Sequence, residues 1–244
     1  MRNRHDQRRV QFSRRRSLSD ANETQTPMKL ACASNAFDHA IGRGDLTQIE
    51  FIELCARELA VDGIVLDVRH FPRIDDDYLA QIKKMATDLG LGIAALHDDT
   101  FFISDEASMQ AGLRIALAIG SPLIAAPLAA ETTLPWAGQL GLLNTAAGLA
   151  KAANVTLAVR NAPGTFAASV HDLKRASKET DSAWLRFGPE PALFDASEDV
   201  MAIANKVVLV WTHDAIGASG ITPFASYRGY VVVQPHEASA IRSN

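Results

Sequence analysis

The sequence predicts an α/β fold, a (β/α)₈ or TIM barrel with reduced last helices, and three observations support this prediction. Apolar runs suited to strands begin near Leu30, Ile64, Ile93, Leu123, Val155, Trp184, Val207 and Tyr230. Stretches with a helical period separate most of these runs. The runs are almost continuously apolar, which is typical of parallel strands buried on both faces. Eight such units fit residues 28–244 as a single barrel domain.

The predicted helices follow the strands in chain order. Residues 47–60 place several apolar side chains on one face, which would pack on the barrel: Ile49, Ile52, Ala56 and Leu59. Residues 76–89 have Asp75 in front as an N-cap and Gly90 behind as a terminator. Similar helical patterns cover residues 106–119, 136–153, 169–180 and 197–205.

The last quarter of the chain is short for two more crossover helices. Only residues 216–228 separate the seventh and eighth strands, and only residues 237–244 follow the eighth. We therefore expect a reduced seventh helix and a stunted eighth one. Apolar barrel surface left uncovered there would favour a homo-oligomer. An open doubly wound sheet is the alternative fold, but its glycine fingerprint, Gly90–Ala95, leaves a helix rather than entering one.

Residues 1–27 differ in composition from the rest of the chain. They hold seven arginines against three acids, whereas the whole chain has a net charge of −4. Because so few apolar residues cannot form a core, we expect a disordered basic leader. Its Arg14–Arg16 run lacks the apolar segment of an export signal. The leader is then an inert extension, a nucleic-acid arm, or sequence upstream of a start at Met28.

Composition also limits location and partners. No apolar run reaches the ~18 residues of a transmembrane helix, so we expect no membrane partner. Cys32 and Cys55 stand in apolar patterns without a Cys-x-x-Cys pair, which is typical of a reducing, cytoplasmic location. The acidic barrel region argues against nucleic acid as a partner. The expected partner is a small-molecule substrate, either a sugar or an anion.

Six segments together carry a family resemblance: Met28–Asn35, Leu46–Phe51, Val61–Asp67, Gly90–His97, Asn154–Val159 and Gly229–Val233. In their order and spacing they resemble the sugar phosphate isomerase/epimerase family, the xylose isomerase-like TIM barrels. The resemblance extends over about residues 28–236. It implies an isomerase or epimerase activity on a sugar or a sugar phosphate.

The resemblance also implies a divalent metal, held by Glu, Asp, His and Glu from the fifth to the eighth strand. The corresponding positions of this sequence hold Arg160, Gly188, Trp211 and Gln234. A fixed positive charge and the loss of carboxylates disfavour a metal, so we expect a degenerate metal site and no cofactor. Mn²⁺ or Mg²⁺ would bind only if other residues, such as His97, His213 and Glu190, replaced the usual ligands.

In a barrel, functional residues lie at the carboxyl ends of the strands, and several strands here end in polar residues. The candidate catalytic residues, as acids or bases, are His97, Asp98 and His213. The candidate substrate-binding residues are Asp67, Arg69, His70, Arg160, Asn161, Glu190, Trp211 and Gln234. Arg160 suits an anionic oxygen, although an internal ion pair would explain it equally well.

Two functions agree with these residues. The first is a sugar isomerase or epimerase that works without a metal, with Arg160 polarising the substrate oxygen. The second is a pseudoenzyme, a barrel that binds a small anion without chemistry. A nuclease similar to the metal-rich DNA-repair barrels is disfavoured, because the sequence lacks their many histidine and acidic ligands.

Overall fold

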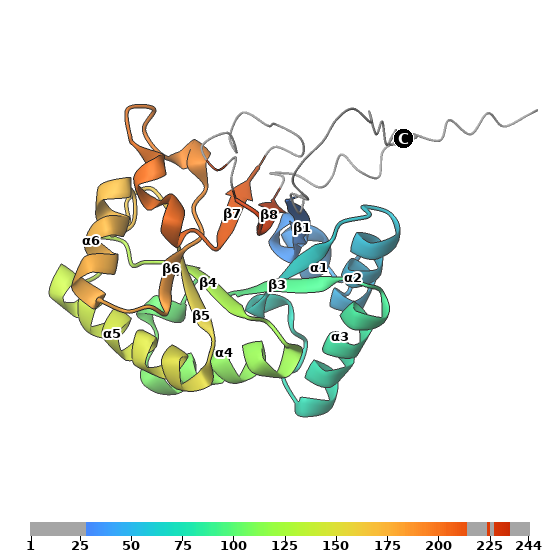
Figure 1. Ribbon diagram of the computed structural model, residues 1–244. Coiled ribbons are helices and arrows are strands. Elements are labelled where there is room, and N and C mark those ends of the chain that lie inside the picture. Colours follow the sequence, from blue (N-terminus) through green and yellow to red (C-terminus); the bar gives the residue numbers. More distant parts are fainter. Residues whose placement is uncertain (1–27, 214–223, 225–226, 235–244) are drawn as a thin grey trace, which may run out of the picture.

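Eight parallel strands curl into a nearly closed barrel in the computed structural model, which describes residues 28–213, 224 and 227–234 (Figure 1). The strands are β1 (Lys29–Ala33), β2 (Gly63–Asp67), β3 (Gly92–His97), β4 (Leu123–Pro127), β5 (Thr156–Arg160), β6 (Leu185–Phe187), β7 (Leu209–Thr212) and β8 (Tyr230–Val233). Their order in the sheet is β6-β5-β4-β3-β2-β1-β8-β7, and an isolated bridge from Phe187 to Val207 joins the two edges. The predicted (β/α)₈ TIM barrel is confirmed.

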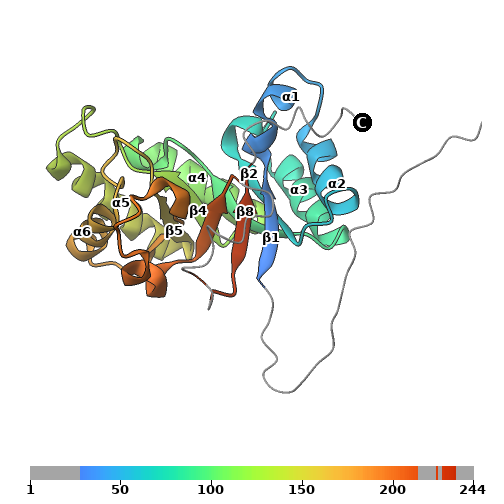
Figure 2. The same cartoon turned by 90° about the horizontal axis from the view of Figure 1, so that it is seen from above.

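Helices fill the crossovers on the outside of the barrel (Figure 2). The α-helices are α1 (Asp38–Gly42), α2 (Gln48–Arg57), α3 (Asp76–Asp88), α4 (Glu106–Ile119), α5 (Trp136–Ala153) and α6 (Val170–Thr180). Short 3₁₀ helices follow several strands: η1 (Ser34–Phe37), η2 (Val68–His70), η3 (Phe101–Ile103) and η4 (Pro191–Leu193). Asp75 caps α3 as predicted, because its side chain accepts the Tyr78 N–H.

The predicted helix at 197–205 is wrong in type, because this crossover holds a 3₁₀ helix, η5 (Val200–Lys206). Two aspartates explain the difference. Asp195 accepts the Ser197 N–H at 2.9 Å, and Asp199 accepts the Met201 N–H at 3.1 Å. Such side-chain turns compete with α-helical hydrogen bonds. The sixth crossover, between β6 and β7, is therefore already shortened. The sequence predicts shortened helices only after the seventh and eighth strands.

Three of the sequence predictions concern the ends of the chain and its environment. The predicted leader, residues 1–27, lies outside the described residues, as do residues 237–244 and most of 216–228. Cys32 and Cys55 are buried free thiols. Among the described helices, none is both long and apolar enough to span a membrane.

Small side chains line the barrel interior and leave room for a few large ones. The buried interior residues are Ala31, Ala33, Val65, Ala94, Ala95, Ala125, Ala158, Leu209, Trp211 and Val232. Near the amino-terminal ends of the strands Tyr230 lies across Gly63 and Gly92, where a Cβ at Gly92 would stand 2.1 Å from the Tyr230 hydroxyl. Toward the other end the completely buried Trp211 packs edge-on to His97, with 5.6 Å between ring centroids. Trp211 is thus the floor of the barrel mouth.

Candidate functional site

The barrel mouth is formed by polar residues at or just after strand ends: Asp67, His97, Arg160, Glu190, His213 and Gln234. Parallel strands place all of their carboxyl ends at one end of the barrel, which brings these residues together. They come from β2, β3 and β5 and from the segments after β6, β7 and β8. All six are among the residues that the sequence analysis singles out.

Asp67 is a buried anchor for two cationic side chains. Its Oδ2 lies 2.9 Å from His97 Nδ1 and accepts from Arg69 Nη2 at 2.8 Å, and its Oδ1 accepts from Arg69 Nε at 3.0 Å. Burial alone raises the pKa of Asp67, but the hydrogen bonds from His97 and Arg69 outweigh burial and hold that pKa well below its usual range. Asp67 is therefore a fixed carboxylate that orients the His97 ring.

The second ring nitrogen of His97 has two competing neighbours. Nε2 lies 2.9 Å from Arg160 Nη1 and 3.2 Å from Asp99 Oδ1. Burial lowers the pKa of His97, but hydrogen bonds with Asp67 and Asp99 outweigh burial and raise it, while the charge of Arg160 opposes them. His97 thus combines the geometry and the perturbed proton affinity of an acid/base group.

Asp99, rather than the predicted Asp98, belongs to this cluster. Asp98 Oδ1 accepts from the Thr100 N–H and hydroxyl at 2.9 and 2.8 Å, and its Oδ2 faces Gly112 of α4. It therefore closes a turn on the helix side. Asp99 shares the inward side with His97, two residues before it, so the alternation of a strand continued past its end would have indicated it.

Arg160 places a guanidinium at the centre of the mouth. It stacks on the Trp211 indole at 3.8 Å, and its Nη2 lies 3.4 Å from Gln234 Oε1 and 3.8 Å from Glu190 Oε2. Its side chain is 14% exposed. Burial lowers the pKa of Arg160, and the carboxylates of Glu190, Asp99 and Asp67 oppose that shift. An arginine nevertheless keeps its charge in a protein, so the mouth holds a permanent cation.

Glu190 is held in the mouth by its backbone. Asn161 Nδ2 donates to the Glu190 carbonyl at 3.1 Å, and Asn161 Oδ1 accepts the Glu190 N–H at 2.7 Å. Asn161 is buried, so the structure places it as a support for Glu190 rather than at an open surface. Glu190 Oε1 lies 2.8 Å from His213 Nε2, and His213 Nδ1 lies 2.6 Å from the Gln234 carbonyl oxygen. Glu190 thus bridges Arg160 and His213.

His70 contacts Ser34 and Asp38, two residues that the sequence did not indicate as candidates. Its Nδ1 lies 2.8 Å from Ser34 Oγ, and its Nε2 lies 2.8 Å from Asp38 Oδ1. Ser34 Oγ in turn accepts the Asp67 N–H at 2.9 Å. Because Ser34 is completely buried, this Asp–His–Ser row supports the backbone of Asp67 and presents no open nucleophile. Nothing in the sequence pattern links Ser34 to His70.

One buried polar atom beside Arg160, the indole Nε1–H of Trp211, lacks a hydrogen-bond partner among the described residues. Glu190 Oε1 is buried as well, and it lies 2.8 Å from His213 Nε2. Buried polar atoms without partners are uncommon and call for an explanation such as a ligand or a water.

Comparison with known proteins identifies the fold. Neither a family model nor a curated protein matches the sequence. L-ribulose 3-epimerase is similar at 15% identity and a TM-score of 0.66, over 87% of this chain and 82% of that one. The 3-keto-D-glucoside 4-epimerase YcjR from E. coli is similar at 14% identity and a TM-score of 0.65, over 87% of this chain and 93% of that one. AP endonuclease, family 2, from Brucella melitensis is similar at 15% identity and a TM-score of 0.66, over 87% of this chain and 94% of that one.

The chain has the xylose isomerase-like TIM-barrel fold. Proteins with this fold include one named as an epimerase and one named as an endonuclease, so the fold alone does not assign a function. Any argument about function must rest on the residues of the mouth.

Asp67, His97 and Asp99 bring one ligand atom each within 4.8 Å of one another, close enough for a single metal ion. Guanidinium groups already contact the same atoms, because Arg69 pairs with Asp67 and Arg160 Nη1 lies 2.9 Å from His97 Nε2. A divalent cation here would face two fixed positive charges. The donor set does not fit a metal in this arrangement.

The family resemblance places a metal at the ends of β5 to β8, and the residues there do not fit a metal either. The guanidinium of Arg160 lies between the groups that would surround it. A Cβ at Gly188 would stand 3.4 Å from Trp211 Nε1 and 3.5 Å from the Cβ of Ala158. The indole therefore borders the space into which a side chain at position 188 would extend.

Proposed function

We propose that the protein is a small-molecule enzyme of the isomerase/epimerase kind, which acts on a sugar or a sugar phosphate without a divalent metal. The observation that carries this proposal is the guanidinium of Arg160 at the centre of the mouth, 2.9 Å from the acid/base candidate His97. The unpartnered Trp211 N–H beside it supports a hydroxylated ligand, because a sugar hydroxyl can accept its hydrogen bond.

The chemistry follows from the positions of these groups. Above its raised pKa, His97 is neutral, and its Nε2 takes the proton from the carbon next to the substrate carbonyl. The electrons of that C–H bond form an enediolate. Arg160 stabilises the oxygen that becomes negative, as a metal would. A proton returned to the neighbouring carbon completes an isomerisation, in which the enediolate hydroxyl proton passes to the other oxygen, and a proton returned to the opposite face of the same carbon completes an epimerisation. His213, whose side chain is 24% exposed, donates this proton from its own ring, and exchange with solvent then removes the proton from His97 and restores that of His213.

A second candidate is a barrel that binds an anionic small molecule without turning it over. It is favoured by the internal contacts of Arg160, which stacks on Trp211 and faces Gln234 and Glu190. A guanidinium already held in this way acts as a fixed anchor for a carboxylate or a phosphate. Such a protein would keep the site and lack the chemistry.

Solvent deuterium exchange separates the two candidates. Chelator-treated protein is incubated in D₂O with a panel of aldoses, ketoses and sugar phosphates, and NMR follows the proton next to each carbonyl. The proposal expects exchange that survives EDTA, that His97→Gln and Arg160→Gln abolish, and that Arg57→Gln on the exposed end of α2 leaves unchanged. Arg57→Gln is the matched control, because it removes the same charge far from the mouth.

Each remaining outcome decides against one candidate. A melting temperature raised by a panel member without any exchange would overturn the enzyme and leave the binding barrel. Exchange that appears only when Mn²⁺ is added would overturn the metal-free reaction. Neither exchange nor a thermal shift across the panel would contradict both candidates.

A further inference from the structure

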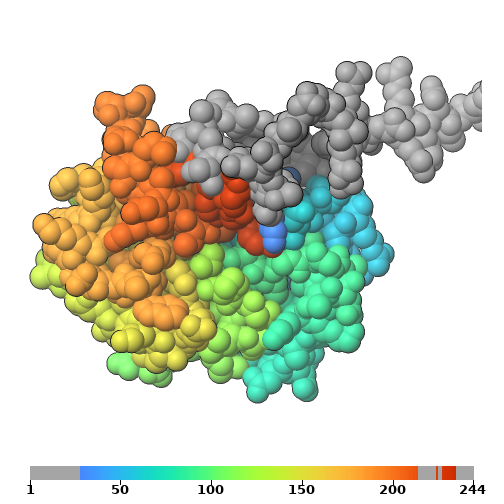
Figure 3. All heavy atoms as spheres, in the orientation of Figure 1, coloured from blue at the N-terminus to red at the C-terminus, as the bar shows by residue number. Residues whose placement is uncertain are grey.

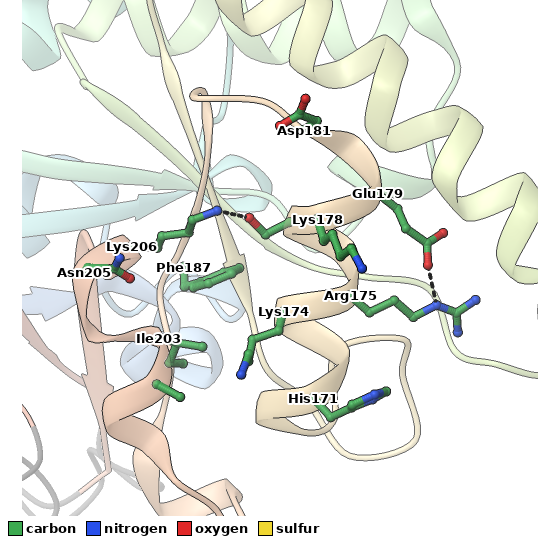
Figure 4. A pocket seen from close by; sticks show the side chains of 12 residues that line it. His171, Lys174, Arg175, Lys178, Glu179, Asp181, Phe187, Ile203, Asn205 and Lys206 are labelled. Carbon is green, nitrogen blue, oxygen red and sulfur yellow. Dashed lines mark hydrogen bonds and ion pairs between the residues drawn. The ribbon is translucent and has the colours of Figure 1, made fainter.

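A cavity of about 790 Å³ lies between α6 and η5, on the outer surface of the barrel and away from its mouth (Figure 4). The cavity lies at the short sixth crossover, where η5 spans only 7 residues and packs beside α6. Figure 3 shows the outer surface of this part of the molecule in yellow and orange. Its inner side includes the buried side chains of Phe187 and Ile203.

The lining of this cavity is basic on a chain that is acidic overall. Four lysine and arginine side chains line it, against two acids, while the whole chain has a net charge of −4. One of these acids is already committed, because Glu179 accepts from Arg175 Nε at 2.9 Å and from Trp136 Nε1 at 2.8 Å. Figure 4 shows the Arg175–Glu179 pair on the flank of α6 turned away from Phe187.

Lys174 and Lys178 are the cations outside these hydrogen bonds, and the charge of Lys178 also helps to lower the pKa of Glu179. They stand one turn apart on α6, and within the part of the chain that the structure describes neither makes a hydrogen bond or an ion pair. Residues four apart on a helix have neighbouring side chains, so both ammonium groups can reach one anion. Lys206 from η5 donates to Ser177 at the opposite wall and brings a third positive charge to the cavity.

We infer that the α6–η5 cavity binds a phosphate-bearing small molecule. Lys174, Lys178 and Lys206 all line the cavity, and a phosphate accepts charge-assisted hydrogen bonds from ammonium groups that turn toward it. Phe187 and Ile203 close the inner side but are almost completely covered, so a ligand here contacts mainly polar side chains. The volume lies within the range of small-molecule sites and favours such a ligand over a protein surface. This site is independent of Arg160 and of the reaction proposed at the mouth.

Calorimetric titration of the full chain with inorganic pyrophosphate at low ionic strength tests the inference. The double variant Lys174→Glu/Lys178→Glu should weaken binding about tenfold or more. Lys174→Arg/Lys178→Arg should keep most of it, which shows that the helix still folds. Lys151→Glu in the last turn of α5 is the matched control and should leave the affinity unchanged. Arg160→Gln should also leave it unchanged, because it alters only the mouth.

Five results would overturn the inference. The first three are no measurable heat with the unaltered protein, equal affinity in the Lys174→Glu/Lys178→Glu variant, and an equal loss in Lys151→Glu, which would mean a diffuse charge effect. Loss of pyrophosphate binding in Arg160→Gln would move the anion to the mouth. A glutamate-rich peptide that binds more tightly than pyrophosphate would replace the small molecule with an acidic segment of a partner protein.

Discussion

Nη1 of Arg160 lies 2.9 Å from Nε2 of His97, and this contact sets two demands against each other. Arg160 can only donate, so it requires a neutral His97 whose Nε2 accepts. Asp99 Oδ1, 3.2 Å from the same nitrogen, requires a protonated one. Burial disfavours the charged ring, but hydrogen bonds with Asp67 and Asp99 raise the pKa of His97, so the carboxylates prevail. Arg160 then depends on Glu190, Gln234 and Trp211 for its remaining contacts.

The protonation of His97 predicts how stability depends on pH. A histidine whose pKa is raised by folding stabilises the protein fully below its unfolded value of about 6.5, and this contribution is lost as the pH rises through the raised value. The free energy of unfolding of the unaltered protein, relative to His97→Gln, should therefore fall as the pH rises from about 6.5 through the raised pKa of His97. Urea unfolding at a series of pH values measures it. A difference that grows with pH would mean that neutral His97, accepting from Arg160, is the favoured state.

The pairing of Arg160 with Glu190 predicts strong coupling between their substitutions. Arg160→Gln removes the cation beside a carboxylate that is almost fully buried, and should lower the free energy of unfolding by about 3 kcal/mol. Adding Glu190→Gln should recover part of this loss, because no uncompensated charge then remains. Arg114→Gln is the control, since its exposed pair with Asp76 contributes at most about 1 kcal/mol. Additive losses in a double-mutant cycle would show that the two side chains do not interact.

The strands and most helices could be predicted because their signals are local. Continuous apolar runs indicated eight buried strands, and the Asp75 cap indicated where α3 begins. The 197–205 pattern failed because Asp195 and Asp199 bond to nearby backbone N–H groups, and a periodic apolar pattern does not reveal that competition.

The mouth could be predicted as a set of residues but not as a set of contacts. Strand ends identified Asp67, His97 and Arg160, because parallel topology alone brings these positions together. The alternation of β3, continued two residues past its end, gives Asp98 the helix side and Asp99 the inward side, so extending the strand pattern would have placed Asp99 rather than Asp98 in the mouth. Asn161 supports a loop 29 residues further along the chain, a relationship that no local pattern encodes.

Gly188 and Trp211 predict an asymmetric response to two substitutions at one position. In Gly188→Ala the new Cβ would stand 3.4 Å from Trp211 Nε1 and 3.5 Å from the Leu209 Cβ, which is ordinary contact. Its effect on the free energy of unfolding should stay within about 1 kcal/mol. Gly188→Asp adds a carboxylate beside the indole in the buried interior, and should destabilise the fold by about 3 kcal/mol through overpacking and a buried charge. Chemical denaturation measures both variants. A tolerated Gly188→Asp would show that the indole moves aside and that the site can readmit a carboxylate.

Titration with Mn²⁺ tests whether the guanidinium of Arg160 excludes a metal. Chelator-treated protein should show no stoichiometric binding, with any Kd weaker than about 1 mM, because Arg69 and Arg160 already contact the atoms that would ligate. Arg160→Gln removes one of these positive charges and should strengthen any remaining Mn²⁺ binding. If the charge of Arg160 did not exclude the metal, this substitution would leave the affinity for Mn²⁺ unchanged. Tight binding by the unaltered protein that Asp99→Asn abolishes would place a metal among Asp67, His97 and Asp99. That result would mean that the guanidinium groups of Arg69 and Arg160 move away from these atoms when the ion binds. His97 would then act as a metal ligand rather than as a base.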